Sequence, residues 1–396
     1  MSGSMVRQRS EMSIYLDHNA TTALRPEAAA AMAAAIGNTG NPSSVHRHGR
    51  HARRLIEDAR EQVAAAVGTA PARVVFTSGG TEANALAVVG TRRRRILVSA
   101  VEHLSVLRAA ERAEVIPVDD DGVVRLDALK AMLAAAAEPA LVSVMLANNE
   151  TGVLQPVAEV ATIARRFGAL VHCDAVQAVG RIAVDAAALG ADLLSFSAHK
   201  VGGPAGVGAL VVDPAVPLAA QLTGGGQERG RRAGTENTIG IAGFGAAAAA
   251  AADRSDMLRL GHLRDRLERS LHAACPSMQV FGAGAARLPN TSCLAMPGVD
   301  SETQVIAFDL EGVCISAGSA CSSGKVTRSH VLDAMGVGGE IAGSAVRVSL
   351  GWTTGERDVE RFIEVWISVY ARMQARRPSP AALQVAAARP RVMSER

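Results

Sequence analysis

Residues 193–204 read Leu-Leu-Ser-Phe-Ser-Ala-His-Lys-Val-Gly-Gly-Pro, a short apolar run that passes through small polar residues to a lysine and a glycine-rich turn. This pattern predicts a buried strand that ends just before Lys200. Similar runs lie on both sides of it, at Val74–Thr77, Ile96–Ser99, Leu141–Leu146, Leu170–Cys173 and Gly208–Val212. Ala-rich helical stretches separate these runs, for example Glu82–Val89, Arg125–Ala136 and Val157–Phe167. The alternation predicts an α/β fold, a mostly parallel sheet flanked by helices that binds ligands at the carboxyl ends of its strands.

The pattern changes after the alanine run at 246–252. Apolar residues then recur every three or four positions, which predicts an amphipathic helix; they are Met257, Leu260, Leu263, Leu267 and Leu271. We therefore expect a large domain over residues 14–252 and a second, smaller α+β domain over 253–376, joined by the N-terminal residues 1–13. Residues 377–396 are predicted to be a loosely ordered tail.

The composition excludes several classes of protein. The chain has 396 residues and a net charge of +3, with 41 basic and 38 acidic residues, so we expect no nucleic acid as a partner. The longest uncharged stretch, 237–252, is shorter than the ~20 apolar residues of a membrane span, so we predict a buried helix there and no membrane association. The arginines at 92–95 are expected to form a solvated turn.

Five cysteines without a C-x-x-C pair argue against a disulfide framework and a zinc site. They favour a reducing compartment, and the N-terminal residues lack the apolar segment of a signal peptide, so a cytoplasmic location is expected. His46, His48 and His51 have no acidic or cysteine ligand nearby in the sequence, and we expect no metal.

Lys200 is one of three lysines, and it follows a predicted strand. Asp174 ends another predicted strand, which lies one β-α-β step before Lys200 in the sequence. Pyridoxal phosphate (PLP) requires such a pair, a lysine for the Schiff base and a carboxylate for the pyridinium nitrogen. A solvated loop lysine is the alternative interpretation.

Two further segments fit a PLP enzyme. Residues 76–82, Phe-Thr-Ser-Gly-Gly-Thr-Glu, form a predicted strand, turn and helix start that would suit a phosphate, although a plain helix cap with Thr81 or Ser78 is the alternative. Cys321 lies in a run of small residues, Gly-Ser-Ala-Cys-Ser-Ser-Gly at 318–324, where a thiol would be accessible. Cys173 and Cys314 lie in apolar runs and are expected to be packed.

Taken together, the motifs resemble the cysteine desulfurases of the NifS/IscS type, in the class V aminotransferase group of fold-type I PLP enzymes. The resemblance runs from Tyr15 to about Arg372. Its motifs are YLDHNATT (15–22), GNPSSVHRHG (40–49), FTSGGTEANALA (76–87), NNETGV (148–153), HCDAVQAVG (172–180), SFSAHK (195–200), GGGQERGRRAGT (224–235), GSACSSG (318–324) and VRVSLG (346–351).

The resemblance implies a role for each matching residue. Lys200 matches the Schiff-base lysine, His103 the imidazole stacked over the ring and Cys321 the persulfide cysteine. Further cofactor contacts are implied for Gly80, Thr81, Asn149, Asp174, Gln177, Ser197, His199 and Thr235. Asn149 and Arg347 match the groups that hold the substrate carboxylate. Thr235 matches a phosphate ligand that comes from the other subunit, which implies a homodimer.

The resemblance therefore implies a cysteine desulfurase that converts L-cysteine to L-alanine and leaves a persulfide on Cys321. It further implies a sulfur acceptor or iron–sulfur scaffold protein as partner, for iron–sulfur cluster assembly. A selenocysteine lyase or another class V PLP aminotransferase is the alternative within the fold, although an aminotransferase needs no thiol. A non-enzymatic scaffold is a third hypothesis, against which the intact Lys200, Asp174 and Cys321 argue.

Overall fold

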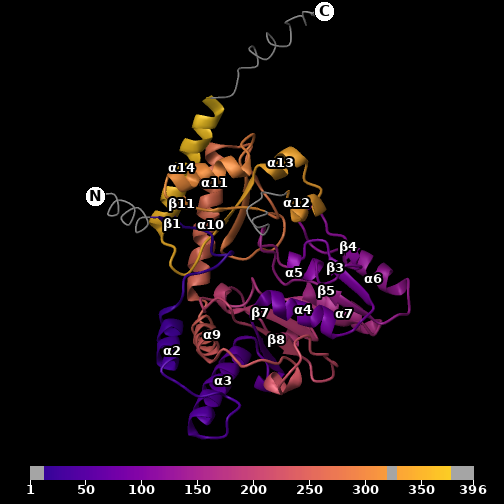
Figure 1. The fold of residues 1–396 in the computed structure, drawn as a ribbon. Coiled ribbons are helices and arrows are strands. Elements are labelled where there is room, and N and C mark those ends of the chain that lie inside the picture. The colour runs from indigo at the N-terminus through magenta and orange to yellow at the C-terminus, as the bar shows by residue number, and fades with distance from the viewer. Residues whose placement is uncertain (1–12, 319–327, 376–396) are drawn as a thin grey trace, which may run out of the picture.

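The computed structural model describes residues 13–318 and 328–375 of the chain (Figure 1). A seven-stranded sheet occupies the first two thirds of this described part, and a four-stranded antiparallel sheet lies in the last third. The predicted tail at 377–396 and Cys321 lie outside the described residues. None of the helices in the described part is long and apolar enough to cross a membrane.

The large sheet has the strand order β2-β8-β7-β6-β5-β3-β4. Only β8 runs antiparallel to its two neighbours among these described strands, so the prediction of a mostly parallel sheet is confirmed. The strands span β2 Val74–Thr77, β3 Arg95–Ser99, β4 Glu114–Ile116, β5 Ala140–Ser143, β6 Leu170–Asp174, β7 Leu193–Ser197 and β8 Gly208–Val212.

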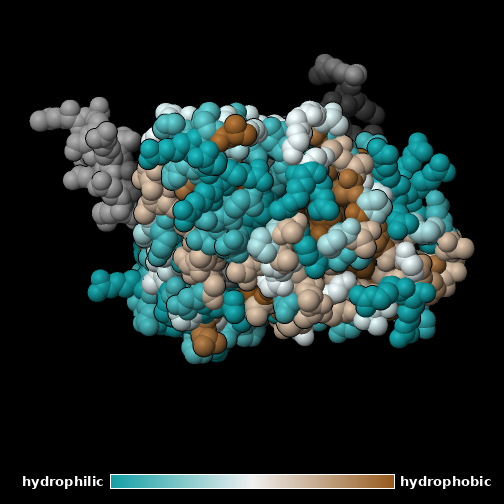
Figure 2. All heavy atoms as spheres, turned by 90° about the horizontal axis from the view of Figure 1, so that it is seen from below, coloured by the Kyte–Doolittle hydropathy of each residue, from teal (hydrophilic) through white to brown (hydrophobic). Residues whose placement is uncertain are grey.

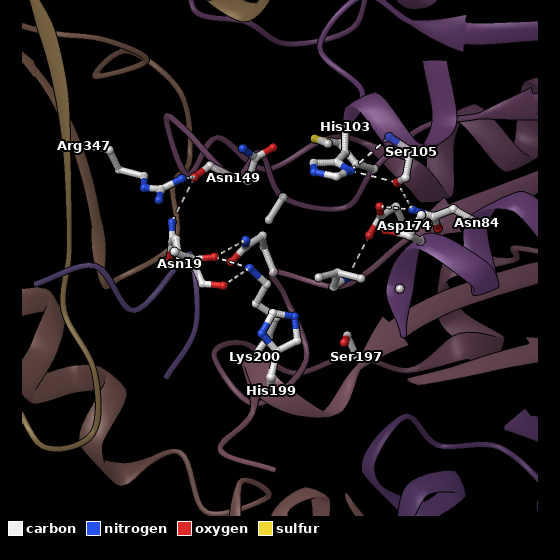
Figure 3. Close-up of a pocket in the computed structure, with 17 residues that line it drawn as sticks. Asn19, Asn84, His103, Ser105, Asn149, Asp174, Ser197, His199, Lys200 and Arg347 are labelled. Carbon is white, nitrogen blue, oxygen red and sulfur yellow. Dashed lines mark hydrogen bonds between the residues drawn. The ribbon is translucent and has the colours of Figure 1, made fainter. Parts of the chain in front are cut away.

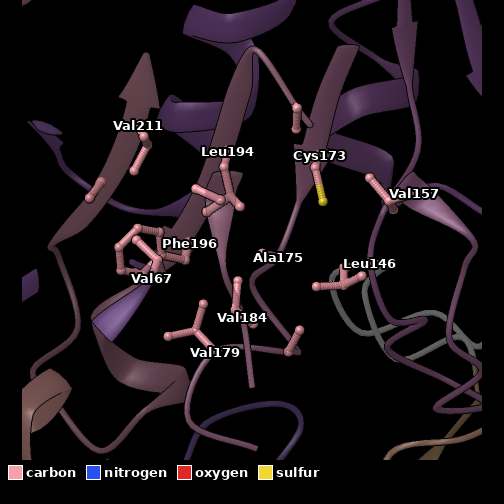
Figure 4. Close-up of a cluster of buried hydrophobic side chains, with 14 of the residues drawn as sticks. Val67, Leu146, Val157, Cys173, Ala175, Val179, Val184, Leu194, Phe196 and Val211 are labelled. Atoms are coloured by element: carbon pink, nitrogen blue, oxygen red, sulfur yellow. The ribbon is translucent and has the colours of Figure 1, made fainter. Parts of the chain in front are cut away.

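Helices cover both faces of this sheet, which explains why its central strands are continuous apolar runs. Alternate residues of one strand enter different cores, as Phe76 and Val75 of β2 do. The core that contains Phe76 also holds Phe196, Cys173 and Val211 (Figure 4). The helices are α2 Pro26–Ile36, α3 Arg47–Ala66, α4 Gly80–Gly90, α5 Leu104–Leu107, α6 Leu126–Ala134, α7 Val157–Arg166, α8 Ala186–Leu189 and α9 Thr238–Ala250.

Helix α9 is the buried helix that the uncharged stretch predicts. Its residues 240–245, 247 and 248 are buried, Ala249 near its end is exposed, and the helix packs against α2 and α3. These three helices lie together at the end of the molecule remote from α14 (Figure 1). Seen from that end, hydrophobic side chains interrupt a mainly hydrophilic surface in several places (Figure 2).

The C-terminal part has its own hydrophobic core. The predicted leucine stripe lies on α10, where Leu260, Leu263, Leu267 and Leu271 are buried, which confirms that helix. The elements are α10 Ser255–Ala274, β9 Gln279–Val280, β10 Thr291–Ala295, α11 Ser301–Leu310, β11 Val313–Cys314, β12 Ser316–Ala317, α12 His330–Ala334, α13 Gly339–Gly343, β13 Ala345–Ser349 and α14 Glu356–Ala375.

The start of the described chain packs with these C-terminal elements. Strand β1 (Ile14–Tyr15) pairs in parallel with β11, and Leu16 is buried in the core of α10 and α14. The sequence offers no local sign of this partner strand, which lies some 300 residues further along the chain. The N-terminal segment therefore links the two parts of the fold.

Two local expectations can be compared with the structure. Arg95 is not in a solvated turn: it begins β3 and is 8% exposed. Its guanidinium donates to both carboxylate oxygens of Glu114 on the adjacent strand β4, at 2.7 and 3.0 Å, which explains its burial.

His46 opens a helix as expected, since its ring accepts a hydrogen bond from the Gly49 amide at the start of α3. No cluster of potential metal ligands occurs among the described residues.

Gly208, the first residue of β8, provides a test of the fold. A Cβ at this position would lie 2.5 Å from the carbonyl carbon of Gly79, which belongs to the turn between β2 and α4. We expect Gly208→Ala to lower the free energy of unfolding by about 1–3 kcal/mol, the usual cost of overpacking. Chemical denaturation measures this. Gly343→Ala is the matched control, because a Cβ there meets nothing within 4 Å; equal stability of the two variants would contradict the close approach.

Candidate active site

A cavity of about 310 Å³ lies at the carboxyl ends of β6 and β7 (Figure 3). The sequence analysis predicts twelve site residues, and ten of them line this cavity although they come from widely separated segments. They are Gly80, Thr81, His103, Asn149, Asp174, Gln177, Ser197, His199, Lys200 and Arg347.

Lys200 ends a short 3-10 helix (Ala198–Lys200) that directly follows β7. Its Nζ donates hydrogen bonds to the backbone carbonyls of Asn19 and Ala20, the latter at 2.6 Å. The turn after it brings Gly202 to φ +88°, a left-handed conformation that favours glycine. The lysine amine is therefore held at the cavity by carbonyl groups from the N-terminal segment.

Asp174 ends β6, beside the strand that carries Lys200. Its side chain is buried at 5% exposure, and each carboxylate oxygen accepts one hydrogen bond. Asn84 Nδ2 donates to Oδ2 at 2.7 Å, and the Val176 amide donates to Oδ1 at 2.9 Å. Since a carboxylate has about four acceptor positions, Asp174 can accept a further hydrogen bond from a protonated ring nitrogen.

A hydrogen-bonded chain connects this carboxylate to His103. Asn84 Nδ2 also donates to the Ser105 hydroxyl at 2.9 Å, and this hydroxyl lies 2.8 Å from His103 Nδ1. The Ser105 amide donates to the same Nδ1 at 3.1 Å, which places the proton of the neutral ring on Nε2. Burial lowers the pKa of His103; Asp174 opposes this, and the positive charge of Lys200 adds to it.

His199, on the same 3-10 helix as the lysine, is also kept neutral. Burial, with Lys200 and Arg181 as further causes, lowers its pKa to about 4. Its Nδ1 lies 3.3 Å from the Thr21 hydroxyl, which belongs to the same N-terminal segment that contacts Lys200.

The turn between β2 and α4 closes another side of the cavity. Gly79 is the N-cap of α4, and the Glu82 carboxylate accepts a hydrogen bond from the Ser78 amide at 2.7 Å. Neither Ser78 nor Thr81 caps the helix through its side chain, so the simple capping interpretation is wrong. A Cβ on Gly80 would lie 2.9 Å from Val176 Cγ2, so the close approach of the helix start to the cavity requires glycine. The N-terminus of a helix is a favourable place for a phosphate.

Arg347 reaches the cavity from β13 of the second sheet. It is 3% exposed, and it donates from NH1 to the Asn149 carbonyl at 3.0 Å and from NH2 to Asp17 Oδ1 at 2.6 Å. The Asn149 carbonyl also accepts from Asn19 Nδ2 at 3.1 Å. A buried guanidinium held in this way is suited to a substrate carboxylate, which it binds through charge-assisted hydrogen bonds.

The profile of the Aminotransferase class-V family matches residues 14–362. The chain belongs to this family. A cysteine desulfurase of Cereibacter sphaeroides is 43% identical over 380 residues, covering 92% of this chain and 97% of the relative. An IscS-like cysteine desulfurase of Mycobacterium tuberculosis is 42% identical, covering 93% and 98%. The solved NifS-like protein from Rickettsia africae superimposes with a TM-score of 0.84 at 39% identity, over 91% of this chain and 99% of that one.

Class-V aminotransferases use PLP, and the residues of this cavity fit that cofactor. An amine and a carboxylate lie at the ends of two adjacent strands, and a glycine that leaves no room for a Cβ lies at the start of α4. Lys200 would hold the cofactor covalently, Asp174 would bind its ring nitrogen and the turn at Gly80 and Thr81 would take its phosphate. Gln177 also lines the cavity and donates from Nε2 to the Asn19 carbonyl at 3.0 Å.

Two nominated residues are not among those that line the cavity. Thr235 is exposed, and it lies outside the lining of the cavity. Cys321 belongs to the residues that the structure does not describe. Among the cysteines that the structure describes, Cys173, Cys275 and Cys293 are buried and thus closed to solvent. Burial also raises the pKa of Cys173, Cys293 and the half-buried Cys314, which disfavours the thiolate form.

Several residues of the site escaped the sequence interpretation. Asn19, Asn84, Ser105 and Asp17 all hold catalytic candidates by hydrogen bonds. Asn19 and Asp17 belong to the motif at 15–22, and Asn84 belongs to the motif at 76–87. Membership of these motifs was the sequence signal that could have identified them as site residues. Asn19 contacts Lys200 through its backbone carbonyl, whereas Asn84 and Asp17 use their side chains. These three partners lie 80 or more residues away, and no local pattern encodes such contacts.

The geometry predicts that Lys200 binds the cofactor. We expect purified Lys200→Ala to lose the visible absorbance of the lysine-linked PLP, because Lys200 is the amine that the structure places at the Asn19 and Ala20 carbonyls. Spectrophotometry of the purified variants measures this. Lys130→Ala, on the exposed face of α6, is the control and should keep the band. A Lys200→Ala protein that stays yellow would refute the assignment.

Proposed function

We propose that this class-V family chain acts as a cysteine desulfurase: it removes sulfur from L-cysteine, releases L-alanine and retains the sulfur as a persulfide on Cys321. The observation that carries this proposal is the convergence of Lys200, Asp174 and the buried Arg347 on one cavity. Relatives with the printed name cysteine desulfurase, more than 40% identical over 92% of the chain, support it. The direct test is formation of alanine and sulfide when the purified enzyme receives cysteine and a reductant.

Arg347 binds the substrate carboxylate in this proposal, and Asp17 and Asn149 hold the guanidinium in place. PLP, when bound, withdraws electrons from the α-carbon of the attached amino acid. Lys200 then takes the α-proton, since the carbonyls of Asn19 and Ala20 keep its amine at the cavity. His103, with its proton on Nε2, is the second group that can hold or return a proton there.

Sulfur transfer requires a nucleophilic thiol. The Cys321 thiolate attacks the sulfur of the substrate, an S–S bond forms, and the bond between that sulfur and Cβ of the substrate breaks with its electrons on carbon. L-cysteine and one thiol thus become L-alanine and one persulfide, so the reaction needs no external oxidant. Cys321 is favoured by its small-residue segment and by the buried state or raised pKa of the cysteines that the structure describes.

The assembly and partners are also part of the proposal. A homodimer would allow Thr235 of one copy to reach the phosphate of the other, which agrees with its exposure and with its absence from the lining of its own cavity. A sulfur-acceptor or iron–sulfur scaffold protein would then remove the persulfide sulfur. The cytoplasm, where cysteine thiols stay reduced, is the proposed location.

Arg347→Ala tests the carboxylate site. We expect weaker cysteine binding with PLP still bound, because a charge-assisted guanidinium–carboxylate interaction contributes about 1.5–3 kcal/mol, or about 10- to 150-fold in affinity. The Michaelis constant for cysteine and the PLP content measure the two effects. Arg125→Ala, an exposed arginine on a surface ion pair, is the control. An unchanged Michaelis constant would show that another group holds the carboxylate.

Cys321→Ser tests the sulfur step. The variant should keep its yellow colour and still change its spectrum when cysteine is added, because Lys200 and Arg347 are intact. It should form no alanine from cysteine and carry no extra sulfur by tryptic mass spectrometry. Cys314→Ser, the matched control, should retain the full reaction. Alanine production by Cys321→Ser at the normal rate would overturn the role of this cysteine.

A further inference from the structure

The loop that carries Thr235 is fixed by three ion pairs to two different helices. We call these pairs the charge clamp. Two of its anchors lie on α3 and one on the first turn of α4, and the loop residues flank Thr235 on both sides. The pairs are Arg60–Glu228, Arg53–Glu236 and Glu82–Arg232.

The pair at the base of the loop is fully buried. The side chains of Arg60 and Glu228 are each 2% exposed, and the guanidinium donates to both carboxylate oxygens, at 2.7 and 2.8 Å. Glu228 also accepts the Phe76 amide at 2.9 Å, while Arg60 lies 4.7 Å from the centre of the Phe76 ring. Ion pairs that are buried this deeply often gain little net stability, and in some proteins they fix one geometry.

The backbone at this pair is strained. Glu228 and Arg229 have φ values of +47° and +58°, a left-handed conformation that non-glycine residues rarely adopt, and Gly230 follows at +75°. Such conformations persist only where the surroundings determine them, and they concentrate at functional sites. The Arg60–Glu228 pair and a hydrogen bond from Arg229 to the Ala72 carbonyl at 2.8 Å supply that determination.

The other two pairs hold the loop on either side of Thr235. Arg232 donates to both oxygens of Glu82 at 2.8 and 3.2 Å, and Glu82 in turn accepts the Ser78 amide of the phosphate turn. Glu236 is buried, and its Oε1 lies 3.6 Å from a guanidinium nitrogen of Arg53. Neither carboxylate oxygen of Glu236 has a hydrogen-bond partner among the described residues. Thr235 itself remains exposed between these anchors.

The clamp thus fixes the loop on both sides of Thr235, an exposed residue that does not line the cavity of its own chain. We propose that the charge clamp is a device that presents Thr235 to the cofactor phosphate of a second copy of this chain, so that its members are positioning residues that act on the partner's site. The inference rests on the proposed function, because it assumes a homodimer with PLP in each subunit. It assigns to Arg60 and Arg53 an effect on a cavity to which neither contributes a lining residue.

Hybrid dimers distinguish action on the partner's site from action within the same chain. Arg60→Lys keeps the positive charge but loses the bidentate geometry, and Lys200→Ala removes one cofactor linkage. Differently tagged chains are co-expressed, and each hybrid is purified through both tags. In the split hybrid the two substitutions lie on different chains; in the joint hybrid one chain carries both and the other is unchanged.

Each hybrid then has one intact Lys200, and its PLP dissociation constant is measured by the visible absorbance. In the split hybrid the intact Lys200 receives Thr235 from a chain with an unaltered clamp, so its affinity should equal that of a hybrid with Lys200→Ala alone. In the joint hybrid the loop comes from the altered chain, and PLP binding should weaken about tenfold, as for loss of a charge-assisted hydrogen bond. The opposite order, or equal weakening in both hybrids, would overturn the proposal.

A second variant guards against a folding defect. Arg53→Gln alters the exposed anchor, whose side chain is 45% exposed, and should give the same order of hybrids with a smaller effect. Arg54→Gln, one residue further on α3, is the matched control because its ion pair with Asp58 lies on the surface outside the clamp. It should leave PLP affinity unchanged in every hybrid.

Failure of the clamp and failure of the proposed function give different results. If the purified chain is a monomer that binds PLP tightly and still forms alanine, the clamp proposal is wrong while the desulfurase proposal stands. If the hybrids follow the predicted order but no alanine forms from cysteine, the clamp is supported and the reaction is wrong.

Discussion

The parallel pairing of β6 with β7 is the constraint on which the site depends. Its register sets Asp174 opposite Ser195, so the carboxylate ends one strand, while the neighbouring strand continues to Ser197 and Lys200 follows three residues later, at the end of the 3-10 helix. Both strands are almost wholly buried, and a one-residue slip of this pairing would move each side chain to the opposite face, misfit both cores and separate the acid from the amine. The rest of the site is arranged around this pair: α4 supplies Asn84 and the phosphate turn, and the second sheet supplies Arg347.

Burial, more than ion pairing, determines the pKa shifts of the histidines in the cavity. His103 and His199 lie near Lys200, and desolvation is the largest cause of the lowered pKa in both. Neutral rings next to an amine avoid a cluster of positive charge that would compete with it for protons. Arg347, by contrast, keeps a carboxylate partner in Asp17, so a buried cation is retained where an anionic substrate group is expected.

The sequence predicted the parts of the site that depend on local order. Lys200, Asp174 and Gly80 each follow a recognisable strand, and parallel strands bring their carboxyl ends to one edge, so their meeting could be anticipated. Asn84, Asn19 and Asp17 could not be assigned in this way, because each acts on a residue that only the folded chain brings near. Arg95 was misplaced for the same reason: its partner Glu114 lies on a neighbouring strand. The roles of Thr235 and Cys321 still rest on resemblance.

The segment from Ile14 to Thr22 joins the two hydrophobic cores. Leu16 is buried among the C-terminal helices, and a few residues later Asn19 and Ala20 hold the lysine of the large sheet. This short stretch therefore connects Arg347, which donates a hydrogen bond to Asp17, with Lys200, which donates to Asn19 and Ala20. A truncation or circular permutation that opens the chain within residues 14–22 would therefore uncouple the contacts of Lys200 from those of Arg347 and disturb the C-terminal core at Leu16.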